Sequence, residues 1–221
     1  MAKHKLKQFS EFESFENTFS FAEEQKGKWH TYFGNENPIV LELACGKGEY
    51  TLGLAEIYPE KNFIGVDIKG NRMWRGAKTA LENKLSNVAF LRTQIERIED
   101  YFAAGEVSEI WITFADPQPR ESKEKKRLTH PLFLNKYRRI GVPGIHLNLK
   151  TDSDLLYAFT LEVIESLKLD KEVDHPNIYQ WTDRPEALNI QTYYEKRWLL
   201  EGISIKYVRF NLSNLLTKEL S

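Results

Sequence analysis

The chain has 221 residues, a formal net charge of −1, 41% hydrophobic residues and 29% charged residues. This length suits one full α/β domain with short additions, and the composition is typical of a globular protein in water. We find no run near the ~18 apolar residues of a membrane span, and we expect no signal peptide, because no apolar segment follows the basic N-terminus. Cys45 is the only cysteine, so no intrachain disulfide can form and a reducing cytoplasm is the expected compartment.

Residues 1–34 are predicted to form an N-terminal helical extension, and residues 35–221 the main domain. Phenylalanines recur at spacings of three and four within residues 9–19, which is typical of a helix that packs one aromatic face on a domain. The segment 35–38 then interrupts this pattern before the first strand.

Strand and helix patterns alternate from residue 39, which predicts βαβ units and a mostly parallel sheet. We predict strands over 39–43, 62–66, 88–92, 108–114 and 144–150. We predict helices over 49–57, 71–84, 95–103, 131–140 and 153–167. The end of the chain differs: a strand over 169–174 precedes a long polar segment, a helix over about 190–200 and a last strand over 204–212. A strand that returns after so long an excursion indicates an antiparallel edge strand.

The turn between the first strand and the next helix has the composition of a nucleotide-type pocket. Glu42 lies at the end of the strand, and Gly46 and Gly48 then allow a tight turn into a helix N-terminus. Asp67 ends the second strand about 20 residues further on, where a Rossmann-type fold places a ribose-binding carboxylate. A carboxylate beside the turn disfavours phosphates but favours a ligand with an ammonium and a sulfonium group. We therefore predict S-adenosylmethionine as the cofactor, in preference to a dinucleotide.

A second constellation follows the strand over 108–114. Asp116 lies between that strand and Pro117, and ligands of open α/β sheets bind outside such strand ends. The prolines at 117 and 119 would stiffen the loop and fix the direction of the carboxylate; the alternative is a plain surface turn.

A basic stretch comes directly after this loop, with Arg120, Lys123, Lys125, Lys126 and Arg127. It suits a phosphate backbone, whose affinity for proteins is mainly electrostatic. The alternative interpretation is a solvated charged face, because two glutamates interrupt the run.

Two later segments have the pattern of a helix N-terminus and contain polar side chains beyond those that capping requires. Asp152 or Ser153 is expected to cap the helix over 153–167, which leaves the other residue at the pocket rim. Thr192 and Glu195 match a capping box, and could also contact a substrate.

These segments together resemble the bacterial tRNA (guanine-N7)-methyltransferase family over nearly the whole chain after the N-terminal helix. The resemblance rests on residues 37–49, 62–70, 116–117, 125–129, 150–152 and 192–195. It implies a Rossmann-like class I methyltransferase fold: α/β, with a mostly parallel seven-stranded sheet, an antiparallel edge strand and helices on both faces.

The resemblance also assigns the site residues. It implies cofactor contacts from Glu42, Gly46, Gly48, Asp67, Gln94 and Asp116, with Asp116 also catalytic. It implies substrate contacts from Arg120, Asp152, Thr192 and Glu195. This sequence departs from the family pattern in having Ala44, Gln94, Ala115, Gln118 and Arg120 where the family usually has Gly, Asp or Asn, Pro, Trp and Lys. Loss of an aromatic ring at 118 would remove ~1–3 kcal/mol of base stacking.

The activity implied is transfer of a methyl group from S-adenosyl-L-methionine to N7 of guanosine 46 in the variable loop of tRNA. The implied partner is tRNA, with no membrane, no metal, and a monomer or homodimer in the cytoplasm. Two rival classes stay open: a methyltransferase of the same fold acting on a small molecule or protein, and a non-catalytic RNA-binding module. The basic residues at 120–139 argue against the first rival, and Glu42, Asp67 and Asp116 argue against the second.

Overall fold

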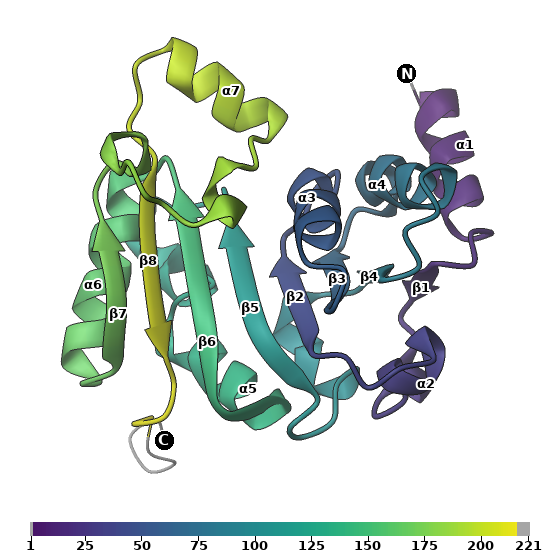
Figure 1. The fold of residues 1–221 in the computed structure, drawn as a ribbon, viewed down its shortest axis with the longest axis horizontal. Helices are drawn as coiled ribbons and strands as arrows, with labels where there is room; N and C mark the ends of the chain where they lie inside the picture. The colour runs from purple at the N-terminus through teal and green to yellow at the C-terminus, as the bar shows by residue number, and fades with distance from the viewer. Residues whose placement is uncertain (1, 216–221) are drawn as a thin grey trace.

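The computed structural model describes residues 2–215, with side chains from residue 5 onward. An eight-stranded sheet forms its centre, in the order β1-β4-β3-β2-β5-β6-β8-β7 (Figure 1). The strands are β1 (Thr18–Ser20), β2 (Ile39–Leu43), β3 (Asn62–Asp67), β4 (Val88–Arg92), β5 (Val107–Thr113), β6 (Gly141–Thr151), β7 (Asp170–His175) and β8 (Lys206–Asn211). The α-helices are α1 (Ala2–Phe12), α2 (Trp29–Phe33), α3 (Glu49–Ile57), α4 (Gly70–Glu82), α5 (Pro131–Ile140), α6 (Asp154–Ser166) and α7 (Tyr193–Leu200). Short 3₁₀ helices are η1 (Glu23–Gln25), η2 (Ile95–Asp100), η3 (Glu121–Lys126), η4 (Ile178–Gln180) and η5 (Glu186–Asn189).

The predicted α/β class with a mostly parallel sheet is confirmed, but the sheet has eight strands and not seven. The additional strand is β1, which pairs in parallel with β4 through Thr18 and Phe90. The predicted N-terminal helix therefore ends at Phe12, and the aromatic pattern continues into a strand, where Phe19 packs edge-on against Trp29. The division at residue 34 stays a prediction.

The reversed strand lies one place in from the edge of the sheet. β8 runs antiparallel to β6 on one side and to β7 on the other, so β7 forms the edge. The last strand, β8, thus lies between β6 and β7, although β7 precedes it in the sequence. The excursion between β7 and β8 carries η4, η5 and α7, which lie over the upper end of β6 and β8 in Figure 1.

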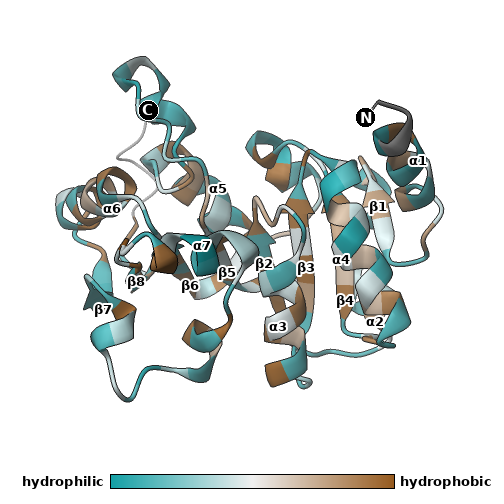
Figure 2. Cartoon of the chain, turned by 90° about the horizontal axis from the view of Figure 1, so that it is seen from above, coloured by the Kyte–Doolittle hydropathy of each residue, from teal (hydrophilic) through white to brown (hydrophobic). Residues whose placement is uncertain are grey.

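Hydrophobic side chains fill both faces of the central strands, as a parallel sheet covered by helices requires. Along β2, Leu41 packs into the cluster that α5 and α6 cover, whereas Val40 belongs to the cluster that α1, α3 and α4 cover. Figure 2 shows these strands between helices on both sides. None of the described helices is long and apolar enough to cross a membrane.

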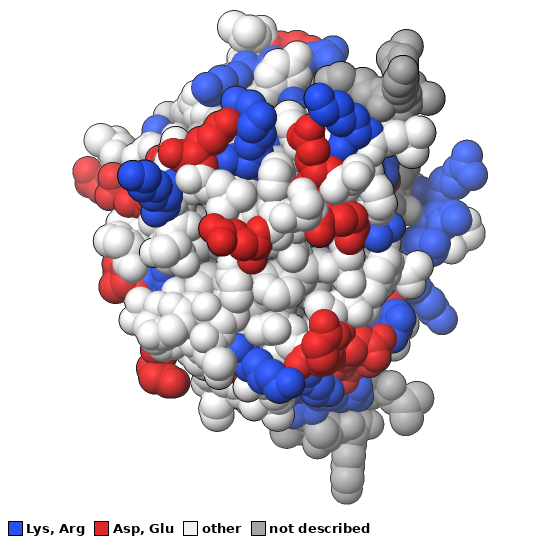
Figure 3. Space-filling view, turned by 90° about the vertical axis from the view of Figure 1, so that its right-hand side faces the viewer, with Lys and Arg blue, Asp and Glu red and all other residues white. Residues whose placement is uncertain are grey.

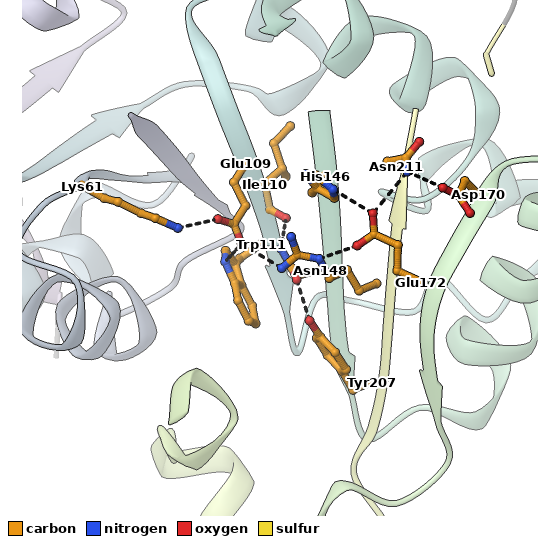
Figure 4. Close-up of polar contacts among 11 residues, drawn as sticks. Lys61, Glu109, Ile110, Trp111, His146, Asn148, Asp170, Glu172, Tyr207 and Asn211 are labelled. Carbon is orange, nitrogen blue, oxygen red and sulfur yellow. Dashed lines mark hydrogen bonds and ion pairs between the residues drawn. The ribbon is translucent and has the colours of Figure 1, made fainter. Parts of the chain in front are cut away.

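A polar network joins β5, β6 and β8 on the second of these faces (Figure 4). Glu109 accepts hydrogen bonds from Trp111 Nε1 at 3.0 Å and Asn148 Nδ2 at 2.9 Å, and pairs with Lys61 at 3.1 Å. Tyr207 on β8 donates to Asn148 Oδ1 at 2.6 Å. Since neighbouring side chains on a sheet face must match across strands, these bonds help to fix the register in which β8 joins the sheet.

The chain passes from β2 outward to β3 and β4, then returns to the other side of β2 to form β5. This reversal is a topological switch point, and the carboxyl ends of β2 and β5 there form a crevice where ligands bind in open α/β sheets.

Candidate active site

The buried carboxylate of Glu42 joins three elements at the switch point. Its side chain is 3% exposed and accepts hydrogen bonds from Thr51 N at 2.8 Å, from the Thr51 hydroxyl, and from the Thr113 hydroxyl. These donors belong to α3 and to the last residue of β5. Burial raises the pKa of Glu42 to about 7, although the three hydrogen bonds oppose this shift.

The turn from β2 into α3 depends on backbone conformations that favour glycine. Gly48 has φ +71°, and a Cβ there would lie 2.5 Å from a ring carbon of Phe90, so that no side chain fits. Ala44 also has a positive φ, +58°, at the position where the family pattern has glycine. A left-handed alanine costs about 1 kcal/mol or more, so Ala44 carries backbone strain beside the pocket.

Asp67 holds this turn from the end of β3. Gly46 N donates to its Oδ2 at 3.0 Å, and Lys69 N donates to its Oδ1 at 2.9 Å. Each carboxylate oxygen has more than one acceptor site, so both can also accept a hydroxyl hydrogen from a ligand.

A cavity of about 500 Å³ opens beside Asp67. Ala44, Asp67, Gln94 and Asp116 line it, each at or just beyond the carboxyl end of a different one of four neighbouring strands. Its apolar walls come from Ile68, Ile95, Leu128 and Phe133. A smaller cavity of about 100 Å³ shares Ala44 with it and is lined by Glu42, Gly46 and Thr192, among others. The predicted cofactor residues are therefore brought together, except that Gly48 shapes the turn and lines neither cavity.

These two cavities fit the chemistry of S-adenosylmethionine. Apolar walls suit an adenine ring, the Asp67 carboxylate suits ribose hydroxyls, and the acidic Glu42 in the narrow cavity suits an ammonium group. Cys45 is buried, which raises the pKa of its thiol well above the ordinary value, so it is not poised as a nucleophile. Among the side chains of residues 5–215, no three His, Cys, Asp or Glu cluster in a way that could hold a metal ion.

The Asp116 loop forms one side of the larger cavity. Asp116 is exposed, and its Oδ1 accepts from Gln118 N at 2.9 Å. Phe114 and Gln118 both have positive φ, +51° and +49°, and Phe114 N donates to Lys150 O at 2.9 Å. Gln118 lines the cavity in the place where the family pattern has tryptophan.

The residues predicted to contact substrate occupy less uniform environments. Thr192 caps α7 by accepting from Glu195 N at 3.2 Å, and it lines the smaller cavity. Ser153, not Asp152, caps α6, and Asp152 stays half-buried with its carbonyl bonded to Lys206 Nζ. Arg120 is exposed at the start of η3. Neither Arg120 nor Asp152 lines the two cavities.

Glu195 lies in the interior and not at the pocket rim. Its side chain is fully buried, pairs with Lys150 Nζ at 2.8 Å, and accepts from the Tyr179 hydroxyl at 2.8 Å. Lys150 is also fully buried and donates to the carbonyls of Leu188 at 3.2 Å and Ile190 at 2.8 Å. Burial lowers the pKa of Lys150 to about 8, an effect that Glu195 opposes. This pair anchors the η5–α7 segment to β6 at the rim of the site.

The basic stretch divides into exposed lysines and one buried arginine. Lys123, Lys125 and Lys126 are exposed on η3, whereas Arg127 is 6% exposed. Arg127 Nε lies 3.3 Å from the Pro117 carbonyl, and Nη2 lies 3.5 Å from that of Gln118. The guanidinium of Arg127 is thus directed inward, unlike the lysines with which the sequence grouped it, and its contact with phosphate stays a prediction.

Sequence reasoning missed the apolar walls and the buried lysine. Ile68 and Ile95 directly follow the motif residues Asp67 and Gln94, so their position was a usable signal. Phe133 comes from α5, and only tertiary packing brings it to the cavity. Lys150 continues the alternation of polar residues that His146 and Asn148 begin in the same strand, so the local pattern gave no signal for a buried ionic contact.

A family model and the fold both place this chain among the methyltransferases. A family model described as "Putative methyltransferase" matches residues 36–208. The structure of the 16S rRNA methyltransferase KamB superposes with a TM-score of 0.62 at 14% identity, over 83% of this chain and 92% of that one. A second structure is that of a mutant 16S rRNA (adenine(1408)-N(1))-methyltransferase from Catenulisporales acidiphilia, solved with its cosubstrate SAM. It superposes with a TM-score of 0.54 at 15% identity, over 83% of this chain and 89% of that one. At such identities, the likeness shows the fold alone.

Sequence relatives define the family more narrowly. Curated tRNA (guanine-N(7)-)-methyltransferases from Bacteroides thetaiotaomicron and Christiangramia forsetii are each 48% identical over 96% of this chain, and the matches cover 87% and 99% of those proteins. One from Clostridium acetobutylicum is 35% identical over 83% of this chain and 85% of its own length. The chain belongs to the tRNA (guanine-N7)-methyltransferase family.

The raised pKa of Glu42 predicts a specific pH dependence of stability. Between the ordinary value of 4.5 and about 7, the folded protein binds a proton that the unfolded chain has lost. The stability contributed by this group therefore declines as pH rises from about 5 to 7, by on the order of 3 kcal/mol. Glu42→Gln should remove this decline in urea unfolding measured across that range. Glu56→Gln, on the exposed side of α3, is the control, and an unchanged pH profile in Glu42→Gln would contradict the assignment.

Proposed function

We propose that this protein transfers a methyl group from S-adenosylmethionine to N7 of guanine in tRNA, at guanosine 46 of the variable loop. The observation that carries the proposal is the convergence of Asp67, Gln94 and Asp116 on one cavity, in a chain 48% identical to curated tRNA (guanine-N(7)-)-methyltransferases. Such a tRNA substrate would place the reaction in the cytoplasm.

When bound, the cofactor supplies an electrophilic methyl group on a sulfonium centre. The protein then needs little acid–base chemistry, because guanine N7 already has an in-plane lone pair and loses no proton before attack. The residues that remain necessary are those that orient the two reactants, and orientation alone can contribute ~7–11 kcal/mol.

Asp116 is the group we assign to the reacting base. One of its oxygens is engaged by Gln118 N, and the other has no hydrogen-bond partner among the described residues. That oxygen can accept from the N1–H and N2–H edge of guanine, and its charge opposes the positive charge that develops on the ring. The carboxylate acts as an orienting and electrostatic group and not as a general base.

The remaining assignments follow from position. Asp67 would bind the ribose, Gln94 the adenine and Glu42 the ammonium group of the cofactor, from the walls of the two cavities. Arg120, Asp152 and Thr192 lie on the C-terminal side of the sheet, where a tRNA could reach them. For Glu195 we propose an indirect role, since its burial against Lys150 fixes the helix that Thr192 begins.

The chain has a formal net charge of −1, so the molecule as a whole is not positively charged. On the side that carries α1 and α4, acidic and basic side chains are interspersed (Figure 3). Affinity for a phosphate backbone must therefore come from a local surface, and the exposed lysines of η3 next to Asp116 provide one.

Cofactor binding can be tested by thermal shift. S-adenosylmethionine and S-adenosylhomocysteine should both raise the melting temperature by mass action, and NAD should not. Asp67→Ala should remove most of the shift, because the ribose loses its paired acceptor, whereas Asp183→Ala, an exposed residue outside the cavities, should not. A larger shift with NAD would overturn the cofactor assignment.

The role of Asp116 separates an enzyme from a binding module. Asp116→Asn should keep the fold and most of the tRNA affinity but lower methyl transfer by ~10²–10³-fold, the effect of removing one preorganised electrostatic group. The assay is labelled methyl transfer to bulk tRNA, with the methylated nucleoside identified. A wild-type rate in this variant would refute the role of Asp116, and no methylation by the wild type would favour the binding module.

The lysine surface should contribute affinity without sequence information. Replacing Lys123, Lys125 and Lys126 by Gln should weaken tRNA binding and reduce the slope of log K against log salt by up to about 0.9 per lost phosphate contact on a duplex. Lys168→Gln, after the distant end of α6, is the matched control. An unchanged slope would mean that these lysines form only a solvated face.

A further inference from the structure

The Asp116 loop has few backbone bonds of its own to hold it. Pro117 and Pro119 lack N–H groups, so the chain on either side of Gln118 offers no backbone donors. Gln118 itself has a left-handed φ of +49°, which a side chain other than glycine adopts at a cost. Among the described residues, no backbone N–H donates to the carbonyl oxygens of residues 117 and 118.

Arg127 supplies side-chain donors to both carbonyls. Its Nε faces the Pro117 carbonyl at 3.3 Å and its Nη2 faces the Gln118 carbonyl at 3.5 Å, so one planar group spans two consecutive peptide units. Its Nη1 lies 3.3 Å from a carboxylate oxygen of Glu124, which partly balances the charge at the protein surface. Only the rigid fork of a guanidinium presents donors at this spacing, since a lysine offers a single point charge.

The surroundings hold Arg127 in this position. The guanidinium carbon lies 4.5 Å from the ring centroid of Phe159 on α6, and a cation over an aromatic face is stabilised there. Residue 127 has an extended backbone, with φ −64° and ψ 129°. Lys126 and Leu128 on either side line the cofactor cavity, whereas Arg127 is directed to the loop. The same short segment thus forms a wall of the cavity and supports the loop opposite.

We propose that Arg127 is a positioning residue for methyl transfer, which sets the direction of the Asp116 carboxylate by holding the carbonyls of residues 117 and 118. This inference rests on the proposed function of Asp116, but the geometry of the loop is independent of it. Arg127 contributes nothing to phosphate binding, in contrast to the exposed lysines before it.

The test compares Arg127→Lys with Arg97→Lys, an equal substitution in an exposed ion-paired arginine of η2. Hydrogen exchange of peptides that contain Gln118 reads out the loop without any activity. Exchange should be faster in Arg127→Lys and unchanged in Arg97→Lys, because the loop loses its second carbonyl donor. Equal protection of the loop in wild type and Arg127→Lys would overturn the proposal.

Kinetics then separate positioning from binding. In Arg127→Lys, the single-turnover methylation rate should fall by on the order of 10- to 100-fold, as expected for a misplaced reacting group. The dissociation constant for tRNA and its salt slope should not change. A flatter salt slope with an unchanged rate would make Arg127 a phosphate contact and overturn the proposal.

A second variant covers the case in which Arg127→Lys does not fold. Phe159→Leu keeps the carbonyl donors but removes the ring beneath the guanidinium, so exchange and rate should change in the same directions by smaller amounts. If neither changes in Phe159→Leu, the inference fails. Absence of tRNA methylation by the wild type would instead refute the proposed function and leave the exchange result to decide the role of Arg127.

Discussion

The hydrogen bonds to the Glu42 carboxylate are the interaction on which the site depends. A single buried side chain on β2 receives donors from the first turn of α3 and from the end of β5. These bonds join β2, α3 and β5 at the switch point. The bonds between β2 and α3 also hold together the two ends of the Ala44–Gly48 turn. No cation pairs with this carboxylate within residues 5–215, so the helix N-terminus and two hydroxyls supply the compensation. The raised pKa is the consequence of that arrangement.

A second buried charge determines where the rim of the site lies. Lys150 lies in the interior one residue before the end of β6 and bonds to two carbonyls of the η5 segment as well as to Glu195. Loss of either partner would leave an uncompensated buried charge, which typically costs 3–5 kcal/mol. This buried pair therefore sets the position of α7 above the glycine-rich turn, and contacts on the exposed surface of the helix do not. Tyr193 N also donates to Glu49 there.

The basic stretch illustrates how neighbouring charges with the same sign take different roles. The lysines of η3 remain in water, where an ammonium group on a flexible chain is well hydrated. Arg127 enters the interior because its planar, more weakly hydrated group can satisfy two carbonyls and stack on Phe159 at once. Composition alone predicted that the whole basic stretch lies on the surface. The lysines and Arg127 differ in burial because the fold places different partners beside them.

The sequence by itself determined the order and type of the main elements and brought most of the candidate cofactor residues to one edge of the sheet. Strand 88–92 and helices 49–57 and 131–140 are found with the predicted bounds, because their hydrophobic periods and flanking breakers are local signals. Asp67 and Asp116 could be placed near one ligand because the carboxyl ends of parallel strands meet at one edge of the sheet, whereas Gln94 was assigned only by the family resemblance.

Tertiary structure alone decided burial and partnership. The place of β8 inside β7, the eighth strand, and the inward direction of Arg127 and Glu195 each depend on residues far away in the chain. A charged side chain reads as a surface group in any local window. Whether it lies in water or in the core is settled by whether a distant partner offers hydrogen bonds that offset its desolvation.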